Sequence, residues 1–259
     1  MPLVAVVRTL SAILFLILYG LLLGPFFILH AMLTGSVHLL YPFSIGGAQI
    51  GLRIAGVRPR AEGLENIPAG VCLFVSNHVS NVDPPAVVGR IPRRVALLAK
   101  RELFRIPLLG TAMRLGRFIP VQRDLPAAAR ASVRLARKYM HEGISYVIFA
   151  EGTRSRDGRL ADFKRGSFLL AIESGAPVVP VSVIGTQHIL PRGAFLVRPG
   201  VARVVFHPPV DVSQYSGEKR KELAERVRAA IASALPPDQQ PRDSRSKTEG
   251  HGLSRADER

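Results

Sequence analysis

The amino-terminal fifth of the chain carries almost no charge. From Thr9 to Leu52 the sequence contains no Lys, Arg, Asp or Glu over 44 residues, and residues 10–33 are almost continuously apolar. A run of that length is too long to bury in a small soluble domain, and it is long enough to cross a bilayer as a helix. The sequence therefore predicts that residues 1–52 form a membrane-anchoring segment.

A Gly-Pro pair at residues 24–25 leaves the geometry of this segment open. Residues 10–33 form either one slightly kinked helix that spans the membrane, or two helices of about fourteen residues that dip into one leaflet as a hairpin. A cleaved signal peptide is a third interpretation, but the apolar run is overlong and no clear Ala-x-Ala site follows it. The basic residues after Arg53 would place the rest of the chain on the cytoplasmic side, at a bacterial inner membrane.

Residues 53–236 show the alternation of an α/β domain. Strands are expected at 54–59, 71–75, 95–99, 118–121, 146–150, 178–184 and 201–206. Helices are expected at 126–142, 164–174 and 217–235, with a broken helical region at 103–115. This order predicts a largely parallel sheet flanked by helices. Residues 237–259 are polar and rich in Pro and charge, so we expect a disordered tail.

The excess of positive charge lies in this α/β domain. Residues 53–236 hold 29 basic and 14 acidic residues, which favours a polyanionic partner such as nucleic acid, a phosphorylated metabolite or an anionic membrane surface. The chain has no Trp and five Tyr, without the basic-aromatic interleaving of base-stacking surfaces. Together with the apolar segment, this argues against nucleic acid as the partner.

The strongest candidate for chemistry is the loop at residues 77–83. It follows the apolar strand at 71–75 and precedes Pro84-Pro85, which suit the first turn of a helix with Asp83 as its N-cap. His78 can take a proton near neutral pH, and Asp83 can fix its tautomer and stabilise the imidazolium. The structural alternative is that Asp83 is only a helix cap and His78 only a polar loop residue.

A second polar loop follows the strand at 146–150. Gly152 allows close approach of the backbone, Thr153 offers a hydroxyl, and Arg154 offers a guanidinium that suits phosphate. Glu151 beside them would hold an arginine or a substrate hydroxyl. Because an Asp-Gly pair follows, a solvated charged turn is the alternative.

Two further stretches complete the pattern. Residues 116–123 contain the short strand at 118–121 and end at Arg123, and residues 178–181, within the strand at 178–184, are apolar with a proline. Arg123 could reach a phosphate, but a lone arginine of this kind is more often just a surface charge.

Taken together, the four stretches resemble the motifs of the glycerolipid acyltransferases, the 1-acyl-glycerol-3-phosphate acyltransferases. The matches are Asn77, His78 and Asp83 for Asn-His-x4-Asp, Gly116 to Arg123 for the second motif, Phe149 and Glu151 to Ser155 for Phe-Pro-Glu-Gly-Thr-Arg-Ser, and Val178 to Val181 for the fourth. The resemblance covers about residues 50–210. Ala150 stands where the family usually has Pro, which would relax the loop before Glu151 without removing a functional group.

The resemblance implies direct acyl transfer to a lysophospholipid. His78 and Asp83 would be catalytic, with His78 deprotonating the sn-2 hydroxyl of lysophosphatidic acid. The hydroxyl would attack the thioester of acyl-CoA or acyl-carrier protein and give phosphatidic acid. The residues implied to bind the acceptor phosphate are Arg123, Glu151, Gly152, Thr153 and Arg154. The sequence shows no metal-ligand cluster, and this chemistry needs neither metal nor cofactor.

Several alternatives stay open at this point. Another lysolipid, such as lyso-ornithine lipid or lysophosphatidylglycerol, is a possible acceptor, and a non-enzymatic anionic-lipid-binding membrane protein is the rival class. A Ser-His-Asp triad is disfavoured because Ser76 and Ser80 flank His78 too closely and neither lies in a Gly-x-Ser-x-Gly elbow.

Overall fold

The computed structural model describes residues 2–121 and 126–241. The strands are β1 (Val57–Glu62), β2 (Leu73–Ser76), β3 (Val95–Lys100), β4 (Ile119–Val121), β5 (Ser145–Phe149), β6 (Val178–Ile184) and β7 (Gly200–Phe206). The α-helices are α1 (Pro2–Thr34), α2 (Leu40–Ile54), α3 (Asp83–Val88), α4 (Leu109–Leu115), α5 (Pro126–His141), α6 (Arg165–Ser174), α7 (Thr186–Ile189) and α8 (Arg220–Ser233). Short 3-10 turns, η1 and η2, lie at Leu64–Asn66 and Arg101–Arg105.

The strands form one sheet in the order β1-β7-β6-β2-β5-β3-β4. Neighbouring strands pair in parallel, except β6 and β7, which are antiparallel. The α/β class and the largely parallel sheet are therefore confirmed. In the centre of the sheet, Ser76 of β2 is level with Phe149 of β5 and with Val181 of β6, so β2 and β5 end together, and β6 continues to Ile184.

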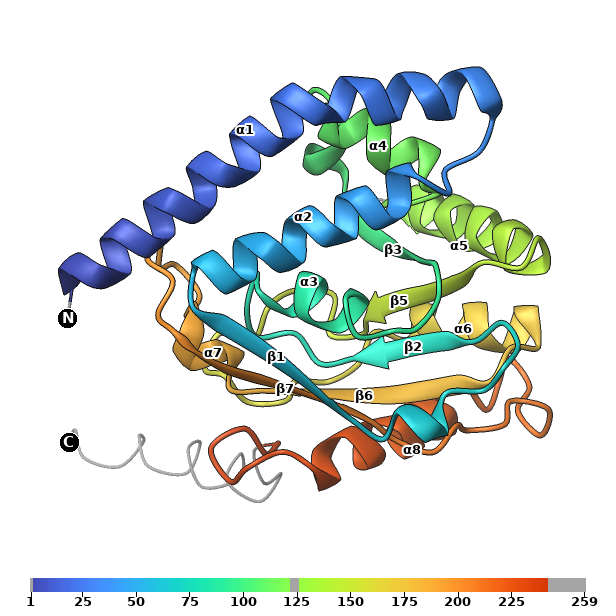
Figure 1. The fold of residues 1–259 in the computed structure, drawn as a ribbon. Coiled ribbons are helices and arrows are strands. Elements are labelled where there is room, and N and C mark those ends of the chain that lie inside the picture. Colours follow the sequence, from blue (N-terminus) through green and yellow to red (C-terminus); the bar gives the residue numbers. More distant parts are fainter. Residues whose placement is uncertain (1, 122–125, 242–259) are drawn as a thin grey trace, which may run out of the picture.

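Helices cover both faces of the sheet, as Figure 1 shows. The central strands are continuous apolar runs because both of their faces are buried; every residue of β2 and of β6 is buried. One core cluster joins the sheet to Met140 of α5, Phe168 of α6 and Ile231 of α8. The other joins it to Val87 of α3 and to residues of α1, α2 and α7.

The apolar segment folds as a helical hairpin, but its turn is not at Gly24-Pro25. Helix α1 continues through Pro25 and bends without breaking, and the chain reverses between Thr34 and Leu40 (Figure 1). The prediction of two helices of about fourteen residues is therefore wrong. A proline removes one hydrogen bond from a helix, which a long helix with packing on either side of the proline tolerates as a bend. The reversal instead begins at Gly35, in the left-handed region with φ +67°.

The two helices of the hairpin are held together by small residues and stacked rings. Gly47 lies so close to the Tyr19 ring that a Cβ would be 2.4 Å from it, and a Cβ on Gly51 would be 3.1 Å from Leu16. The rings of Tyr19 and Phe43 stack with centroids 4.4 Å apart. Spacing two glycines four residues apart lets helices approach closely.

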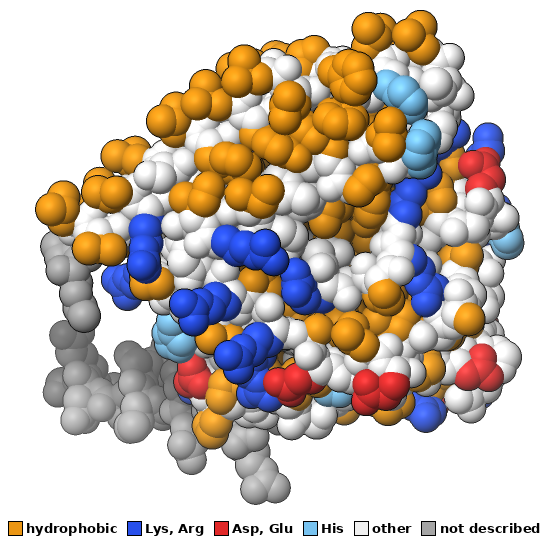
Figure 2. All heavy atoms as spheres, viewed as in Figure 1, with side chains coloured by type: hydrophobic (Ala, Val, Ile, Leu, Met, Phe, Trp, Pro, Cys, Tyr) orange, Lys and Arg blue, Asp and Glu red, His pale blue; other side chains and the backbone are white. Residues whose placement is uncertain are grey.

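The outer face of α1 is apolar and exposed, and it forms the long hydrophobic band of Figure 2. By length and composition, residues 3–34 could cross a membrane. The side chains at least half exposed on this helix are Leu3, Val4, Val7, Leu10, Leu14, Ile17, Leu21, Leu22, Phe26, Leu29, Met32 and Leu33. We call this set the apolar face of α1.

The carboxyl-terminal segment starts by packing on the domain. The N–H of Leu160 donates to the Gln239 carbonyl at 2.8 Å, and Gln239 is 1% exposed. The Gln240 side chain donates to the carbonyls of Ala232 and Leu235, both at 2.7 Å. The rest of the predicted tail, residues 242–259, lies outside the described residues.

Candidate active site

Strand order brings the two polar loops together. Because β2 and β5 are parallel neighbours, the loops that follow Ser76 and Phe149 leave the same edge of the sheet. The N–H of Ser155 donates to the His78 carbonyl at 2.8 Å, so the loops touch through their backbones. This juxtaposition places the residues of the first and third sequence motifs in one site.

His78 and Asp83 form a hydrogen-bonded pair. His78 Nδ1 lies 2.8 Å from Asp83 Oδ2; the imidazole is 12% exposed and the carboxylate is fully buried. A carboxylate can only accept, so Nδ1 carries the proton and Nε2 keeps its lone pair. The ring also packs against Phe149, with centroids 4.4 Å apart. This is the tautomer that a general base needs.

The same carboxylate organises the loop around it. Asp83 Oδ2 also accepts from the N–H groups of Val79 and Ser80, at 2.7 and 2.8 Å. Oδ1 accepts from the Thr186 hydroxyl at 2.5 Å. The prediction that Asp83 is an N-cap is wrong: Val82 is the N-cap of α3 without a side-chain bond, and Asp83 is the first helical residue. Its carboxylate points back because the preceding loop presents N–H groups to it.

Asn77 fastens the start of this loop to β6. Its side chain donates to the Val183 carbonyl at 2.9 Å and accepts from the Val183 N–H at 2.7 Å. Such a two-way amide contact replaces a missing backbone pair and fixes the residue that precedes His78. Ser80 closes the far side, since its hydroxyl donates to the Leu190 carbonyl at 2.9 Å.

The serines near His78 are engaged elsewhere. The Ser76 hydroxyl donates to the Asn77 carbonyl at 3.0 Å, and Ser80 is committed to Leu190. Both side chains are fully buried. Neither therefore supplies the nucleophile of a Ser-His-Asp triad.

Glu151 holds the backbone of His78 through a hydrogen bond. Its Oε1 accepts the backbone N–H of His78 at 2.7 Å, and its Oε2 accepts that of Ala161 at 3.2 Å. Burial raises the pKa of this carboxyl to about 7, although the two N–H donors act in the opposite direction. This differs from the substrate contact that the resemblance implies, because both oxygens already bind the protein's own backbone.

Ala150 adds a backbone contact at the position where the family usually has Pro. Its N–H donates to the Ser76 carbonyl at 3.2 Å, and its carbonyl accepts from the backbone N–H of Lys164 at 2.7 Å. A proline has no N–H to donate, so the alanine extends the pairing of β2 and β5. The loop before Glu151 is tied down, contrary to the expected relaxation.

A large cavity opens in front of His78. Its volume is about 1110 Å³, and its walls are mostly apolar, including Tyr41 and Ile45 of α2. Among the residues predicted to bind substrate, Gly152, Thr153 and Arg154 line it, whereas Glu151 does not. Arg123 lies outside the described residues, so its place is a prediction only.

Four cationic side chains line this cavity: Lys100, Arg154, Lys164 and Arg192. Sequence reasoning identified Arg154 as a site residue and missed Lys100, Lys164 and Arg192. Lys164 could have been found from the sequence, since it directly precedes a predicted helix after the third motif. No sequence feature pointed to Arg192. No Asp or Glu is among the described residues that line this cavity. An apolar space with cations on its wall suits a molecule that has both an acyl chain and phosphate.

The backbone conformation at residue 152 favours glycine. Gly152 has φ +74°, and a Cβ there would lie 3.1 Å from the Lys164 side chain. The sequence predicts close approach at this glycine, and the approaching group in the structure is a lysine of the same chain. The Arg154 carbonyl accepts from the Arg192 guanidinium at 2.8 Å, which ties this loop to the segment after α7.

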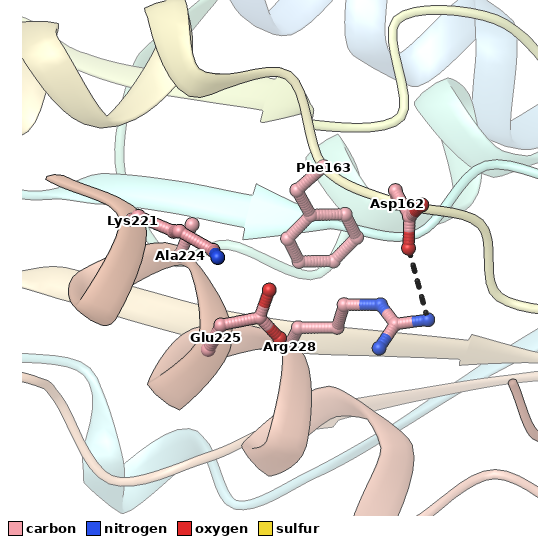
Figure 3. Close-up of a pocket in the computed structure, with 6 residues that line it drawn as sticks. All are labelled: Asp162, Phe163, Lys221, Ala224, Glu225 and Arg228. Carbon is pink, nitrogen blue, oxygen red and sulfur yellow. Dashed lines mark ion pairs between the residues drawn. The ribbon is translucent and has the colours of Figure 1, made fainter. Parts of the chain in front are cut away.

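A second cavity, of about 210 Å³, lies between α8 and the loop before α6 (Figure 3). Its lining residues are Asp162, Phe163, Lys221, Ala224, Glu225 and Arg228. Arg228 pairs with Asp162 at 3.4 Å and donates to the Ala161 carbonyl at 3.3 Å. Since the Ala161 N–H binds Glu151, this cluster supports the loop behind the site.

Comparison with known proteins gives consistent matches. The family model described as Acyltransferase matches residues 58–184. A 1-acyl-sn-glycerol-3-phosphate acyltransferase from Limnanthes douglasii is 34% identical over 81% of this chain and 74% of that protein. One from Pseudomonas aeruginosa is 30% identical over 70% of each. The crystal structure of the 1-acyl-sn-glycerophosphate (LPA) acyltransferase PlsC from Thermotoga maritima has a TM-score of 0.72 and 27% identity, over 86% of this chain and 94% of that one.

Proposed function

Because the chain belongs to the 1-acyl-sn-glycerol-3-phosphate acyltransferase family, we propose that His78 is the general base that makes phosphatidic acid from lysophosphatidic acid. The acyl donor in this proposal is acyl-CoA or acyl-carrier protein. The observation that carries it is that His78, paired with the buried Asp83, lies on the wall of a mostly apolar cavity that also presents cations.

The reaction follows from the tautomer of His78. Nε2 accepts the proton of the sn-2 hydroxyl while the hydroxyl oxygen attacks the thioester carbonyl, and Asp83 stabilises the imidazolium through Nδ1–H. The attack forms the C–O bond of the new ester and gives a tetrahedral intermediate, which collapses as the carbonyl re-forms and the C–S bond breaks. The departing thiolate takes the proton from Nε2, which leaves His78 neutral again. No acyl-enzyme forms, because the attacking hydroxyl belongs to the acceptor.

The acceptor phosphate is proposed to bind at the cationic wall. Arg154 offers a planar guanidinium suited to bidentate phosphate contact, with Gly152, Thr153, Lys164 and Arg192 around it. Arg123 stays in this set on the resemblance alone. Glu151 is left out, because its carboxylate holds two backbone N–H groups.

Replacing Arg154 tests this assignment. We expect Arg154→Ala to raise the acceptor KM by about tenfold to a hundredfold, the effect of losing one charge-assisted hydrogen bond, with little change in the donor KM. Arg156→Ala is the matched control, because Arg156 is exposed on the same loop and does not line the cavity. Steady-state kinetics with each substrate varied in turn measures both constants. A rise confined to the donor KM would assign Arg154 to the donor.

Membrane attachment through the hairpin is the second part of the proposal. Helix α1 contacts the domain near both ends: Thr9 accepts from the Val197 N–H at 2.9 Å, and Ala31 clusters with Leu108. A helix held along the domain in this way suits insertion of its apolar face into one leaflet better than a crossing of the bilayer. Since α2 forms part of the cavity wall, acyl chains would enter from the membrane. We place this membrane surface on the cytoplasmic side, at the bacterial inner membrane.

A charge on the apolar face of α1 should weaken that attachment. Leu22 is 73% exposed, and Leu22→Asp is expected to lower partitioning into vesicles by tenfold or more, given a cost of about 2–3 kcal/mol for a carboxylate in lipid. Leu135→Asp, on the partly exposed face of α5, is the control. Flotation with liposomes of phosphatidylethanolamine and phosphatidylglycerol measures the bound fraction. Equal binding of the wild type and Leu22→Asp would refute insertion by this face.

The activity itself is tested with purified, detergent-solubilised protein and acyl-CoA. Lysophosphatidic acid and a phosphate-free lysolipid are offered in parallel. Transfer to lysophosphatidic acid alone supports the proposal, and transfer to the phosphate-free acceptor keeps the mechanism but overturns the substrate. If neither is acylated, acyl-carrier protein replaces acyl-CoA as donor; failure with both donors would leave non-enzymatic binding of anionic lipid as the better explanation.

A further inference from the structure

One oxygen of the Asp83 carboxylate depends on a residue outside the four sequence motifs. Oδ2 receives three N–H groups, from His78, Val79 and Ser80. Oδ1 receives the Thr186 hydroxyl at 2.5 Å, the one hydrogen bond recorded for this oxygen within the part of the chain that the structure describes. Asp83 and Thr186 are both fully buried. Water therefore has no access with which to replace that hydroxyl.

The fold places Thr186 at this point from a distance of 103 residues in sequence. Thr186 begins α7, directly after β6, the parallel neighbour of β2. Gly185 makes the turn with φ +88°, and a Cβ there would lie 2.8 Å from the Val201 carbonyl. The Asn77 amide clamps Val183 just before this turn. The threonine hydroxyl and the His78 loop are thus both fixed at the carboxyl end of β6.

We propose that Thr186 is a positioning residue for acyl transfer, whose hydroxyl holds the Asp83 carboxylate with Oδ2 facing His78 Nδ1. This inference rests on the proposed role of His78 as general base. A hydroxyl-carboxylate bond of this length belongs to the strongest class of protein hydrogen bonds. It fixes the rotation of the carboxylate, so that Oδ2 stays in place as the acceptor for the imidazole.

Without this bond, Oδ1 is a buried, unsatisfied charged oxygen. The carboxylate then rotates to find another donor or binds a proton, and both changes weaken its bond to His78. The titratable groups that face Asp83 among the described residues are His78 and Glu151. Glu151 adds negative charge as it ionises, which increases the need for a donor on Oδ1.

The test compares Thr186→Val, which keeps the shape and removes the hydroxyl, with Thr186→Ser, which keeps the hydroxyl. Acyl transfer to lysophosphatidic acid is measured from about pH 5.5 to about pH 9. For Thr186→Val we expect kcat to fall about tenfold to a hundredfold, with both KM values within about twofold of wild type. We also expect the acidic limb of its activity profile to move to lower pH, because an imidazolium that is less well paired with Asp83 loses its proton more readily. Thr186→Ser should stay within about threefold of wild type throughout.

Each other outcome counts against the inference. A folded Thr186→Val with wild-type kcat and pH profile overturns it, as does a Thr186→Ser as impaired as Thr186→Val. A loss that is uniform across pH and follows a lower Tm would show a structural role only. His78→Ala separates this inference from the proposed function: if that variant is inactive while Thr186→Val is normal, only the role of Thr186 fails. If His78→Ala is active, the general base is wrong and the role of Thr186 fails with it.

Discussion

His78→Ala is expected to lower kcat for acyl transfer by on the order of a thousandfold, within the range that a positioned general base contributes. The variant loses the nitrogen that takes the hydroxyl proton. Its fold should be unchanged, because the contacts that hold residue 78 are made by the backbone: its N–H binds Glu151 and its carbonyl binds Ser155. KM for both substrates should change little, since the imidazole is one group on a cavity wall of about 1110 Å³.

The measurement is single-turnover and steady-state transfer from acyl-CoA to lysophosphatidic acid, with Tm recorded for each protein. His188→Ala is the control, because that histidine is 73% exposed and does not line the cavity. We expect the control to retain wild-type kcat. Normal turnover by a folded His78→Ala would remove the general-base mechanism altogether.

The second large effect is expected at Glu151. In Glu151→Ala the buried N–H groups of His78 and Ala161 lose their acceptor, which should cost about 1–3 kcal/mol of stability and let the His78 loop shift. We expect kcat to fall by more than tenfold, with a smaller change in the acceptor KM. Glu151→Gln keeps an oxygen that can accept the His78 N–H and should retain much of the activity. If Glu151→Ala instead shows a large rise in the acceptor KM, the result would favour the direct substrate contact that the resemblance implies.

The same residue gives the protein a pH-dependent stability. Burial raises the Glu151 pKa from an ordinary 4.5 to about 7, so the folded state holds this proton over a range in which the unfolded chain has released it. The contribution of Glu151 is therefore fully present below about pH 4.5 and falls as pH rises through about 7, by on the order of 3 kcal/mol. Urea unfolding at several pH values measures this. Glu151→Gln should lose this slope; a slope as steep as that of the wild type would assign it to other groups.

What could be predicted from the sequence was local. His78 and Asp83 are five residues apart in one loop, so their meeting needs no knowledge of the rest of the chain. The strands show as apolar runs because both faces of the central sheet are buried. From residue 57 the expected strands and helices follow one another as in the structure, but α7 was not expected. Of the two interpretations of residues 10–33, the structure has the single bent helix, and the hairpin that this helix forms with α2 was not foreseen. A Gly-Pro pair signals a break that packing along α1 overrides.

The tertiary structure decided which distant residues meet in the site, because those contacts depend on the order of the strands in the sheet. The strand order β6-β2-β5 in the sheet brings together residues that are 73 to 106 positions apart in the chain. It places Thr186 at Asp83, Val183 at Asn77, and Glu151 at the backbone of His78. A buried carboxylate binds whichever donors the fold presents to it. The residue type of Glu151 or Thr186 therefore indicates that it can form a hydrogen bond, and the packing of the sheet determines its partner.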